Sequence, residues 1–171
     1  MFRKTKFDLH RGKLDKLCET LECRGTMVEI GSLAGVSTEI FSRYFERVYS
    51  IDPYIPGYDS NDLNSHAYRL EAAKKIFEER FKGSNAVRQY TITSLEASER
   101  FKDRMFDLIY IDACHTYEGA KQDIDLWRNK GRYIGGHDWN MPVVAAAVLD
   151  SFEAKSIKVF NPNHWLVRRD H

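Results

Sequence analysis

The sequence contains little cysteine and no long apolar segment. Its three cysteines, Cys18, Cys23 and Cys114, are an odd number, and their spacing does not match a zinc motif. Disulfide frameworks need paired cysteines and an oxidising compartment, so we expect a reducing, cytoplasmic setting. No stretch approaches the roughly 20 apolar residues that cross a bilayer, so we expect no membrane partner. The charged start, residues 1–6, is not followed by the apolar region of a secretory signal.

An excess of charge of either sign is also missing. Lys and Arg number 26, and Asp and Glu number 25, which gives a net charge of +1. Broad nucleic-acid binding would need a basic excess, so we expect none. Proline is scarce, with four in 171 residues, and no linker rich in Pro, Gly or Ser divides the chain. Hydrophobic residues make up 43%, which is enough for the core of one domain of ordinary size.

Helical and strand patterns alternate along the chain. Strands that alternate with helices form a mostly parallel α/β sheet covered on both faces. The last two strands have no helix between them, which predicts an antiparallel hairpin at one edge of the sheet. Strands are predicted over residues 26–31, 47–52, 87–92, 106–112, 132–136, 157–160 and 165–168, and helices over 10–23, 37–45, 94–101, 117–128 and 141–154, with a further long helix between the loop at 53–61 and a stop at 83–85.

The loop after the first predicted strand carries two glycines. Gly31 and Gly35 allow a sharp turn and a close approach of the backbone to a ligand. The helix that follows offers free N–H groups at its start. The dinucleotide fingerprint G-x-G-x-x-G is absent, because Leu33 stands where it needs glycine. An ordinary strand-to-helix turn is an equally good interpretation of this loop taken alone.

Asp52 follows the second predicted strand, and Ser94 follows the third. An acid at the end of that second strand can accept hydrogen bonds from both hydroxyls of a ribose. A lone Asp before proline is otherwise a common turn residue. The glycine loop and Asp52, in this order, favour a nucleoside site. Ser94 is expected either at the edge of an adenine or as the cap of the next helix.

Asp112 and His115 follow the fourth predicted strand, and His137 and Asp138 follow the fifth. In open parallel sheets, ligands bind beyond the carboxyl ends of the strands. Imidazole and carboxylate groups can bind a divalent cation, and a histidine can accept a proton from a hydroxyl near neutral pH. A single histidine in a turn is usually structural. Four such groups at two adjacent strand ends favour a functional site.

These segments together resemble the class I S-adenosylmethionine-dependent methyltransferases. Residues 29–37 are similar to the E-x-G-x-x-x-G-x-S form of catechol-type O-methyltransferases. Residues 112–118 are similar to the D-x-D-H-S-Y-E segment of a bacterial group that includes antibiotic-sugar O-methyltransferases. The resemblance implies a Rossmann-like fold, with a seven-stranded, mostly parallel sheet and a C-terminal antiparallel hairpin. It also implies a single domain over residues 1–171, with an N-terminal helix region at 1–24 and a core at 25–171.

The resemblance implies a role for each motif residue. His115 lies where the family has its general base, and Asp112 would act in catalysis as a metal ligand together with His137 and Asp138. Relatives usually have an acid at the position of His137. Its imidazole favours a softer transition metal over magnesium, and metal-free catalysis by His115 stays open. The residues implied in cofactor binding are Glu29, Gly31, Ser32, Gly35, Ser37, Asp52, Ser94 and Asp112.

The sequence therefore predicts an enzyme, a transferase that moves a methyl group from S-adenosylmethionine to a hydroxyl of a small molecule. His115 would act as the base, with assistance from a divalent cation. The alternative is a non-catalytic module that binds S-adenosylmethionine or another nucleoside and serves as a partner subunit. The spacing of Asp112 and His115 counts against that alternative. A homo-oligomer is compatible with the sequence.

Overall fold

The computed structural model describes residues 14–58 and 62–169. Residues 14–19 form a helix that precedes the first strand. The strands are β1 (Thr26–Ile30), β2 (Arg47–Ile51), β3 (Val87–Tyr90), β4 (Phe106–Ile111), β5 (Gly131–Gly136), β6 (Ile157–Phe160) and β7 (His164–Arg168), and the helices are α2 (Val36–Phe41), α3 (Ala67–Arg80), α4 (Ser94–Arg100), α5 (Tyr117–Trp127) and α6 (Pro142–Leu149), with short 3-10 turns η1 (Leu63–Ser65) and η2 (Ala154–Ser156).

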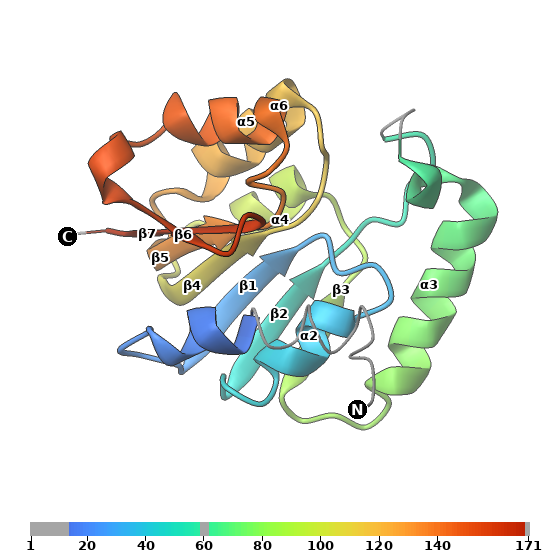
Figure 1. The fold of residues 1–171 in the computed structure, drawn as a ribbon. Coiled ribbons are helices and arrows are strands. Elements are labelled where there is room, and N and C mark those ends of the chain that lie inside the picture. Colours follow the sequence, from blue (N-terminus) through green and yellow to red (C-terminus); the bar gives the residue numbers. More distant parts are fainter. Residues whose placement is uncertain (1–13, 59–61, 170–171) are drawn as a thin grey trace, which may run out of the picture.

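All seven strands form one sheet in the order β3-β2-β1-β4-β5-β7-β6 (Figure 1). Strands β1 to β5 pair in parallel, and β7 lies antiparallel to both β5 and β6. The predicted mostly parallel sheet with a C-terminal hairpin is confirmed. The chain runs from β1 outward to β3 and then returns to β4 on the other side of β1. The carboxyl ends of β1 and β4 therefore form the switch point at which such sheets bind ligands.

Helices cover both faces of the sheet (Figure 1). On one face, α4, α5 and α6 bury an apolar core that includes Phe101, Trp127 and Val148. On the other face, the helix at residues 14–19, α2 and α3 bury a second core that includes Leu17 and Phe41. Within the described residues, no helix has the length and apolar character that crossing a bilayer requires.

Hydroxyl side chains close three helices earlier than the apolar periodicity predicts. Thr20, Ser42 and Ser151 each donate to a backbone carbonyl three or four residues back, at 2.7, 2.9 and 2.7 Å. Such bonds compete with the next turn of helix. The predicted C-terminal limits of the helices at 10–23, 37–45 and 141–154 are therefore wrong, and the first residues of the helix at 10–23 lie outside the described part of the chain.

One buried hydrogen bond joins the middle of the sheet to its antiparallel edge. The hydroxyl of Tyr110 on β4 lies 2.8 Å from Nδ1 of His164 on β7. Both side chains are completely buried, with 0% exposure. A buried polar atom that loses its partner keeps its full desolvation cost, so this bond ties β7 to the parallel part of the sheet.

We expect Tyr110→Phe to lower the free energy of unfolding by about 1–3 kcal/mol, because it removes one partner of a buried hydrogen bond and leaves the ring in place. Urea denaturation followed by circular dichroism measures the change. Tyr68→Phe, at a side chain that is 68% exposed, serves as the control. Equal stability of the wild type and Tyr110→Phe would contradict this account.

Candidate functional site

The loop after β1 presses directly against the end of β4. Gly31 has a φ of +85°, and a Cβ at this position would overlap the carbonyl oxygen of Asp112. The Gly31 amide donates to Ile51 O, and the Asp112 amide donates to Ile30 O, both at 2.8 Å. Glycine is the residue that tolerates both the backbone angle and the contact. Gly31 thus brings the ends of β1, β2 and β4 within one site.

Glu29 supports the loop from below. Its side chain is fully buried, and its carboxyl oxygens accept hydrogen bonds from Ser37 Oγ at 2.5 Å and from Thr38 Oγ1. Burial raises the pKa of Glu29 to about 8, against the opposing effect of these two hydrogen bonds. The carboxyl group therefore holds the start of α2 against β1.

Asp52 ties the loop after β1 to the loop after β2. Its two oxygens accept hydrogen bonds from the Leu33 amide at 2.8 Å and the Tyr54 amide at 2.9 Å. The Tyr54 hydroxyl donates back to the Leu33 carbonyl at 2.8 Å. Burial raises the pKa of Asp52, although the backbone hydrogen bonds oppose this effect. The carboxyl group is therefore held in a fixed orientation at the wall of a cavity.

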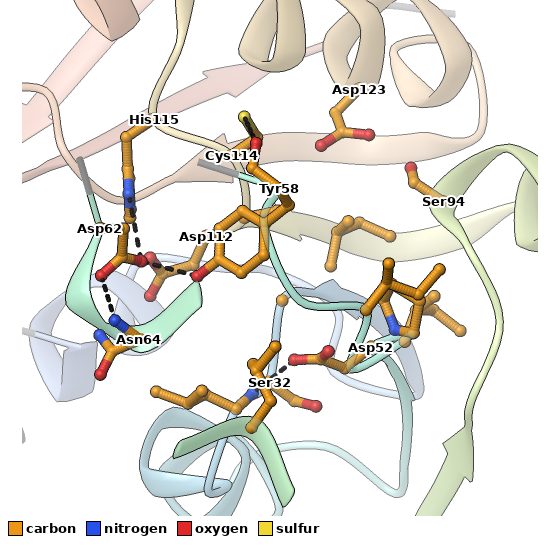
Figure 2. A pocket seen from close by; sticks show the side chains of 18 of the residues that line it. Ser32, Asp52, Tyr58, Asp62, Asn64, Ser94, Asp112, Cys114, His115 and Asp123 are labelled. Carbon is orange, nitrogen blue, oxygen red and sulfur yellow. Dashed lines mark hydrogen bonds and ion pairs between the residues drawn. The ribbon is translucent and has the colours of Figure 1, made fainter. Parts of the chain in front are cut away.

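That cavity has a volume of about 450 Å³ and lies over the ends of β1, β2, β3 and β4 (Figure 2). His115 lines it as well, at the end formed by the loop after β4. Glu29 and Gly35, by contrast, belong to the supporting structure behind the wall. The residues of the predicted cofactor set that line the cavity are Gly31, Ser32, Ser37, Asp52, Ser94 and Asp112.

Thr93, and not Ser94, caps α4. The Thr93 hydroxyl accepts from the Glu96 amide, while the Glu96 carboxylate accepts from the Thr93 amide, which is a complete capping box. Ser94 Oγ instead accepts a hydrogen bond from Trp127 Nε1 at 2.9 Å. Of the two roles predicted for Ser94, the capping role is therefore wrong, and the role beside an adenine stays a prediction.

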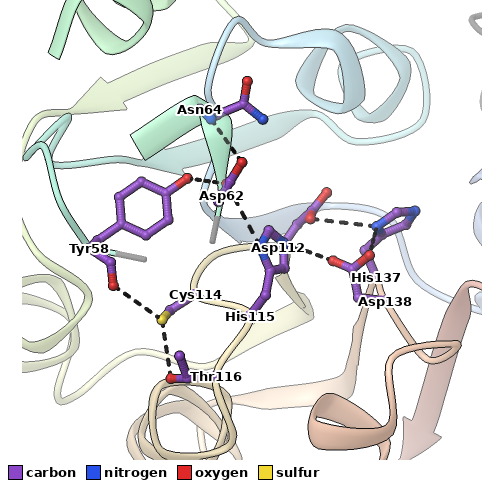
Figure 3. A network of polar contacts seen from close by, with 9 residues as sticks. All are labelled: Tyr58, Asp62, Asn64, Asp112, Cys114, His115, Thr116, His137 and Asp138. Atoms are coloured by element: carbon purple, nitrogen blue, oxygen red, sulfur yellow. Dashed lines mark hydrogen bonds and ion pairs between the residues drawn. The ribbon is translucent and has the colours of Figure 1, made fainter. Parts of the chain in front are cut away.

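The two histidines and two acids predicted at the ends of β4 and β5 lie together (Figure 3). Asp138 lies between the two rings, with Oδ2 at 3.0 Å from His115 Nε2 and Oδ1 at 2.9 Å from His137 Nδ1. His137 Nδ1 is also 3.7 Å from Asp112 Oδ1. The backbone of Asp138 is left-handed, with φ +57°, so the chain turns sharply between the strand and Trp139.

Charge within this cluster is strongly coupled. The hydrogen bond to Asp138 raises the pKa of His115 to about 9, against the effect of burial. Burial alone would raise the pKa of Asp138, but the hydrogen bonds from His115 and His137 outweigh it and hold the pKa well below the usual range. Burial raises the pKa of Asp112 to about 6. Near neutral pH the protonated ring of His115 is therefore favoured, and its Nε2–H donates a hydrogen bond to Asp138.

A three-residue group suited to a divalent cation is present among the described residues. One donor atom each from Asp112, His115 and Asp138 lie within 4.8 Å of one another. Two carboxylates and one imidazole suit manganese, iron or zinc better than magnesium. The predicted metal set contains His137 in place of His115, and the two sets share Asp112 and Asp138.

Two acids that sequence analysis missed also line the cavity, Asp62 and Asp123. Asp62 accepts a hydrogen bond from the Tyr58 hydroxyl at 2.6 Å, and its Oδ2 lies 3.8 Å from His115 Nδ1. Asp62 follows the predicted loop at 53–61, and Asp123 lies on the helix predicted at 117–128. No local pattern marks either acid, because each reaches the cavity only through the packing of its segment.

The burial of Glu29 predicts a dependence of stability on pH. Its pKa of about 8 in the folded protein lies above the ordinary value of 4.5, so the folded state holds a proton that the unfolded state has lost between these values. This contribution to stability therefore falls as pH rises from about 4.5 to about 8. Glu29→Gln should lose less stability over this range, by up to about 1.4 kcal/mol per pH unit.

Urea titrations of the wild type and Glu29→Gln at pH 5, 6, 7 and 8 measure this difference. Exposed Glu46→Gln, a matched change in the loop before β2, should follow the wild type at each pH. Parallel stability curves for the wild type and Glu29→Gln would show that Glu29 keeps an ordinary pKa.

A sequence model of the methyltransferase domain family matches residues 28–138, from β1 to the acid after β5. A search of curated proteins found no match.

Solved structures share the fold at low identity. A protein assigned as a caffeoyl-CoA O-methyltransferase from Staphylococcus aureus is 14% identical, with a TM-score of 0.64 over 99% of this chain and 85% of its own. The N-methyltransferase NodS from Bradyrhizobium japonicum, in complex with S-adenosyl-L-homocysteine, is 16% identical, with a TM-score of 0.63 over 96% and 87%. An rRNA methylase from Streptococcus thermophilus is 11% identical, with a TM-score of 0.59 over 98% and 96%.

The names of these three proteins describe an O-methyltransferase, an N-methyltransferase and an rRNA methylase. What they share with this chain is therefore the fold. The family match covers the glycine loop, Asp52 and the cluster around Asp138. The chain therefore belongs to the methyltransferase domain family, as a class I S-adenosylmethionine-dependent methyltransferase.

Proposed function

We propose that this protein transfers a methyl group from S-adenosylmethionine to a hydroxyl of a small molecule. One observation carries the proposal: a single cavity is lined at one end by the glycine loop and Asp52 and at the other by Asp112 and His115. A nucleoside-binding region and groups that can handle a proton thus share one space. Its volume of about 450 Å³ is in the range of small-molecule sites.

The residues present fit S-adenosylmethionine. Gly31 and Ser32 both line the cavity, and the absence of a side chain at Gly31 lets this part of the wall lie directly against the backbone of Asp112. Asp52 is held by two amides, so its carboxylate is already oriented to accept hydrogen bonds from ribose hydroxyls. The cofactor, when bound, supplies a methyl group already activated on a sulfonium sulfur. The protein mainly has to align the acceptor oxygen for in-line displacement.

His115 is the proposed base, and its protonation sets a condition on that role. Only the neutral imidazole accepts a proton from an acceptor hydroxyl. Because Asp138 raises the pKa of His115 to about 9, the neutral form becomes more abundant as pH rises towards 9. Asp62, on the side of Nδ1, and Asp138, on the side of Nε2, hold the ring at the cavity wall.

A divalent cation is the second part of the proposal. Asp112 and Asp138 would hold it, with His115 or His137 as a nitrogen ligand. A bound cation would lower the pKa of the acceptor hydroxyl. His115 cannot be ligand and base through the same nitrogen, so the metal-dependent scheme assigns the nitrogen ligand to His137 if His115 takes the proton.

The near-neutral charge of the chain favours a small acceptor over a polymer, because polymer nucleic acids are bound by basic surfaces. The alternative, a module that binds the cofactor without transferring the methyl group, predicts ligand binding without turnover. The cofactor and the chemistry are therefore tested separately.

Asp52→Asn should weaken S-adenosylhomocysteine binding about tenfold, because the amide replaces one of two oxygens that orient the loops and face the cavity. Isothermal titration calorimetry measures the dissociation constant. Asp103→Asn, at an exposed acid in the turn before β4, is the matched control and should bind like the wild type. Absence of binding to the wild type at millimolar ligand would refute the cofactor assignment.

His115→Gln should lower kcat at least a hundredfold while it leaves the affinity for S-adenosylhomocysteine nearly unchanged. The assay measures S-adenosylhomocysteine formed from S-adenosylmethionine in the presence of a panel of catechols and hydroxylated sugars. For the wild type, kcat/KM should rise as pH approaches about 9, and His115→Gln should lose this rise.

His66→Gln, at an exposed histidine before α3, controls for the substitution itself. Loss of cofactor affinity in parallel with kcat would assign His115 a structural role. Activity that survives exhaustive chelation would remove the cation from the scheme and leave the base in place. Binding without turnover on any acceptor would favour the non-catalytic alternative.

A further inference from the structure

Asp123 is a buried acid in the cavity wall that the proposed chemistry does not use. It lies on α5, its side chain is 7% exposed, and it lines the same cavity as Ser94 and Asp52 (Figure 2). Figure 2 shows Asp123 away from Asp112 and His115, so it does not belong to the proton-handling end. A carboxyl group that is costly to bury and that faces a cavity calls for a ligand with a hydrogen-bond donor.

The other polar side chains at this end of the cavity are already engaged. Thr93 Oγ1 is engaged with the Glu96 amide and carboxylate in the capping box. Ser94 Oγ accepts from Trp127 Nε1, and because the indole N–H can only donate, the Ser94 proton remains for another acceptor. That acceptor is Asp123, whose pKa is raised to about 6 by burial and lowered in part by the hydrogen bond with Ser94.

The two successive hydrogen bonds, from Trp127 to Ser94 and from Ser94 to Asp123, therefore hold the carboxyl group in place. The carboxyl group can still accept further hydrogen bonds. A carboxylate has about four lone-pair sites on its two oxygens, and one serine hydroxyl occupies a single one of them. Holding α4 against α5 does not require an acid here, because the Trp127–Ser94 bond already joins these two helices.

We propose that Asp123 accepts a hydrogen bond from the exocyclic amino group of the adenine of S-adenosylmethionine. The inference rests on the proposed function, since it assumes that this cofactor occupies the cavity. Asp52 would bind the ribose and Asp123 the far edge of the base, so the two acids select a nucleoside with an amino group at that edge. Ser94 acts as a positioning residue, through Asp123.

The test compares two ligands, S-adenosylhomocysteine and its 6-deamino analogue, in which purine replaces adenine. Calorimetry gives the ratio of their dissociation constants for the wild type and for Asp123→Leu, which is similar in size and has no acceptor. We expect the wild type to bind the 6-deamino analogue about tenfold more weakly. The ratio should fall to about one in Asp123→Leu and stay near the wild-type value in Asp123→Asn, which keeps an acceptor oxygen.

Asp125→Leu is the matched control, because Asp125 lies on the same helix, pairs with Lys121 and is 49% exposed. Its ratio should equal that of the wild type. An unchanged ratio in Asp123→Leu, or equal affinities of the wild type for the two ligands, would overturn the inference and leave the proposed function intact. The comparison of the two ligands on the wild type tests the inference even if Asp123→Leu does not fold. A wild type that binds neither ligand would overturn the proposed function as well.

Discussion

The contact of Gly31 with the backbone of Asp112 is the constraint on which the site depends. No side chain fits at Gly31, and the backbone there must be left-handed. Because the loop after β1 lies directly on the end of β4, the nucleoside-binding groups and the proton-handling groups face one cavity. A larger residue at Gly31 would separate them. The parallel sheet supplies the strand ends, but this single close approach decides how near one another they stand.

Buried carboxyl groups are the second recurring feature of the site. Burial raises the pKa of Glu29, Asp52, Asp112 and Asp123. Glu29, Asp52 and Asp123 each have hydrogen-bond partners that offset part of this cost, from serine and threonine hydroxyls or from backbone amides. Asp138 differs, because two imidazoles hold its pKa low. Among these buried acids, Asp138 is therefore the one held firmly ionised, and it lies beside His115, whereas burial makes Asp112 beside it and Asp52 and Asp123 farther along the cavity harder to ionise.

The strands and the placement of the four-group cluster could be predicted from the sequence, because apolar runs that end on an acid or a glycine are a local signal. The C-terminal limits of three helices could not, since Thr20, Ser42 and Ser151 compete with the backbone in a way that periodicity does not register. The position of Asp123 in the cavity wall could not be predicted from the sequence either. On the helix it is one of several acids, and only the packing of α5 against α4 turns it into the cavity.

His115 shows why the position of a residue at the end of a strand does not by itself determine its chemical role. Its Nε2 lies 3.0 Å from Asp138, and its Nδ1 lies 3.8 Å from Asp62, so both ring nitrogens face carboxylates. Such surroundings stabilise the protonated ring, which is the opposite of what a free base needs. A base in this position works in the fraction of molecules whose ring is neutral, and a cation bound to the carboxylate of Asp138 would enlarge that fraction. The two roles that the sequence left as alternatives, metal ligation and base catalysis, are therefore coupled through Asp138.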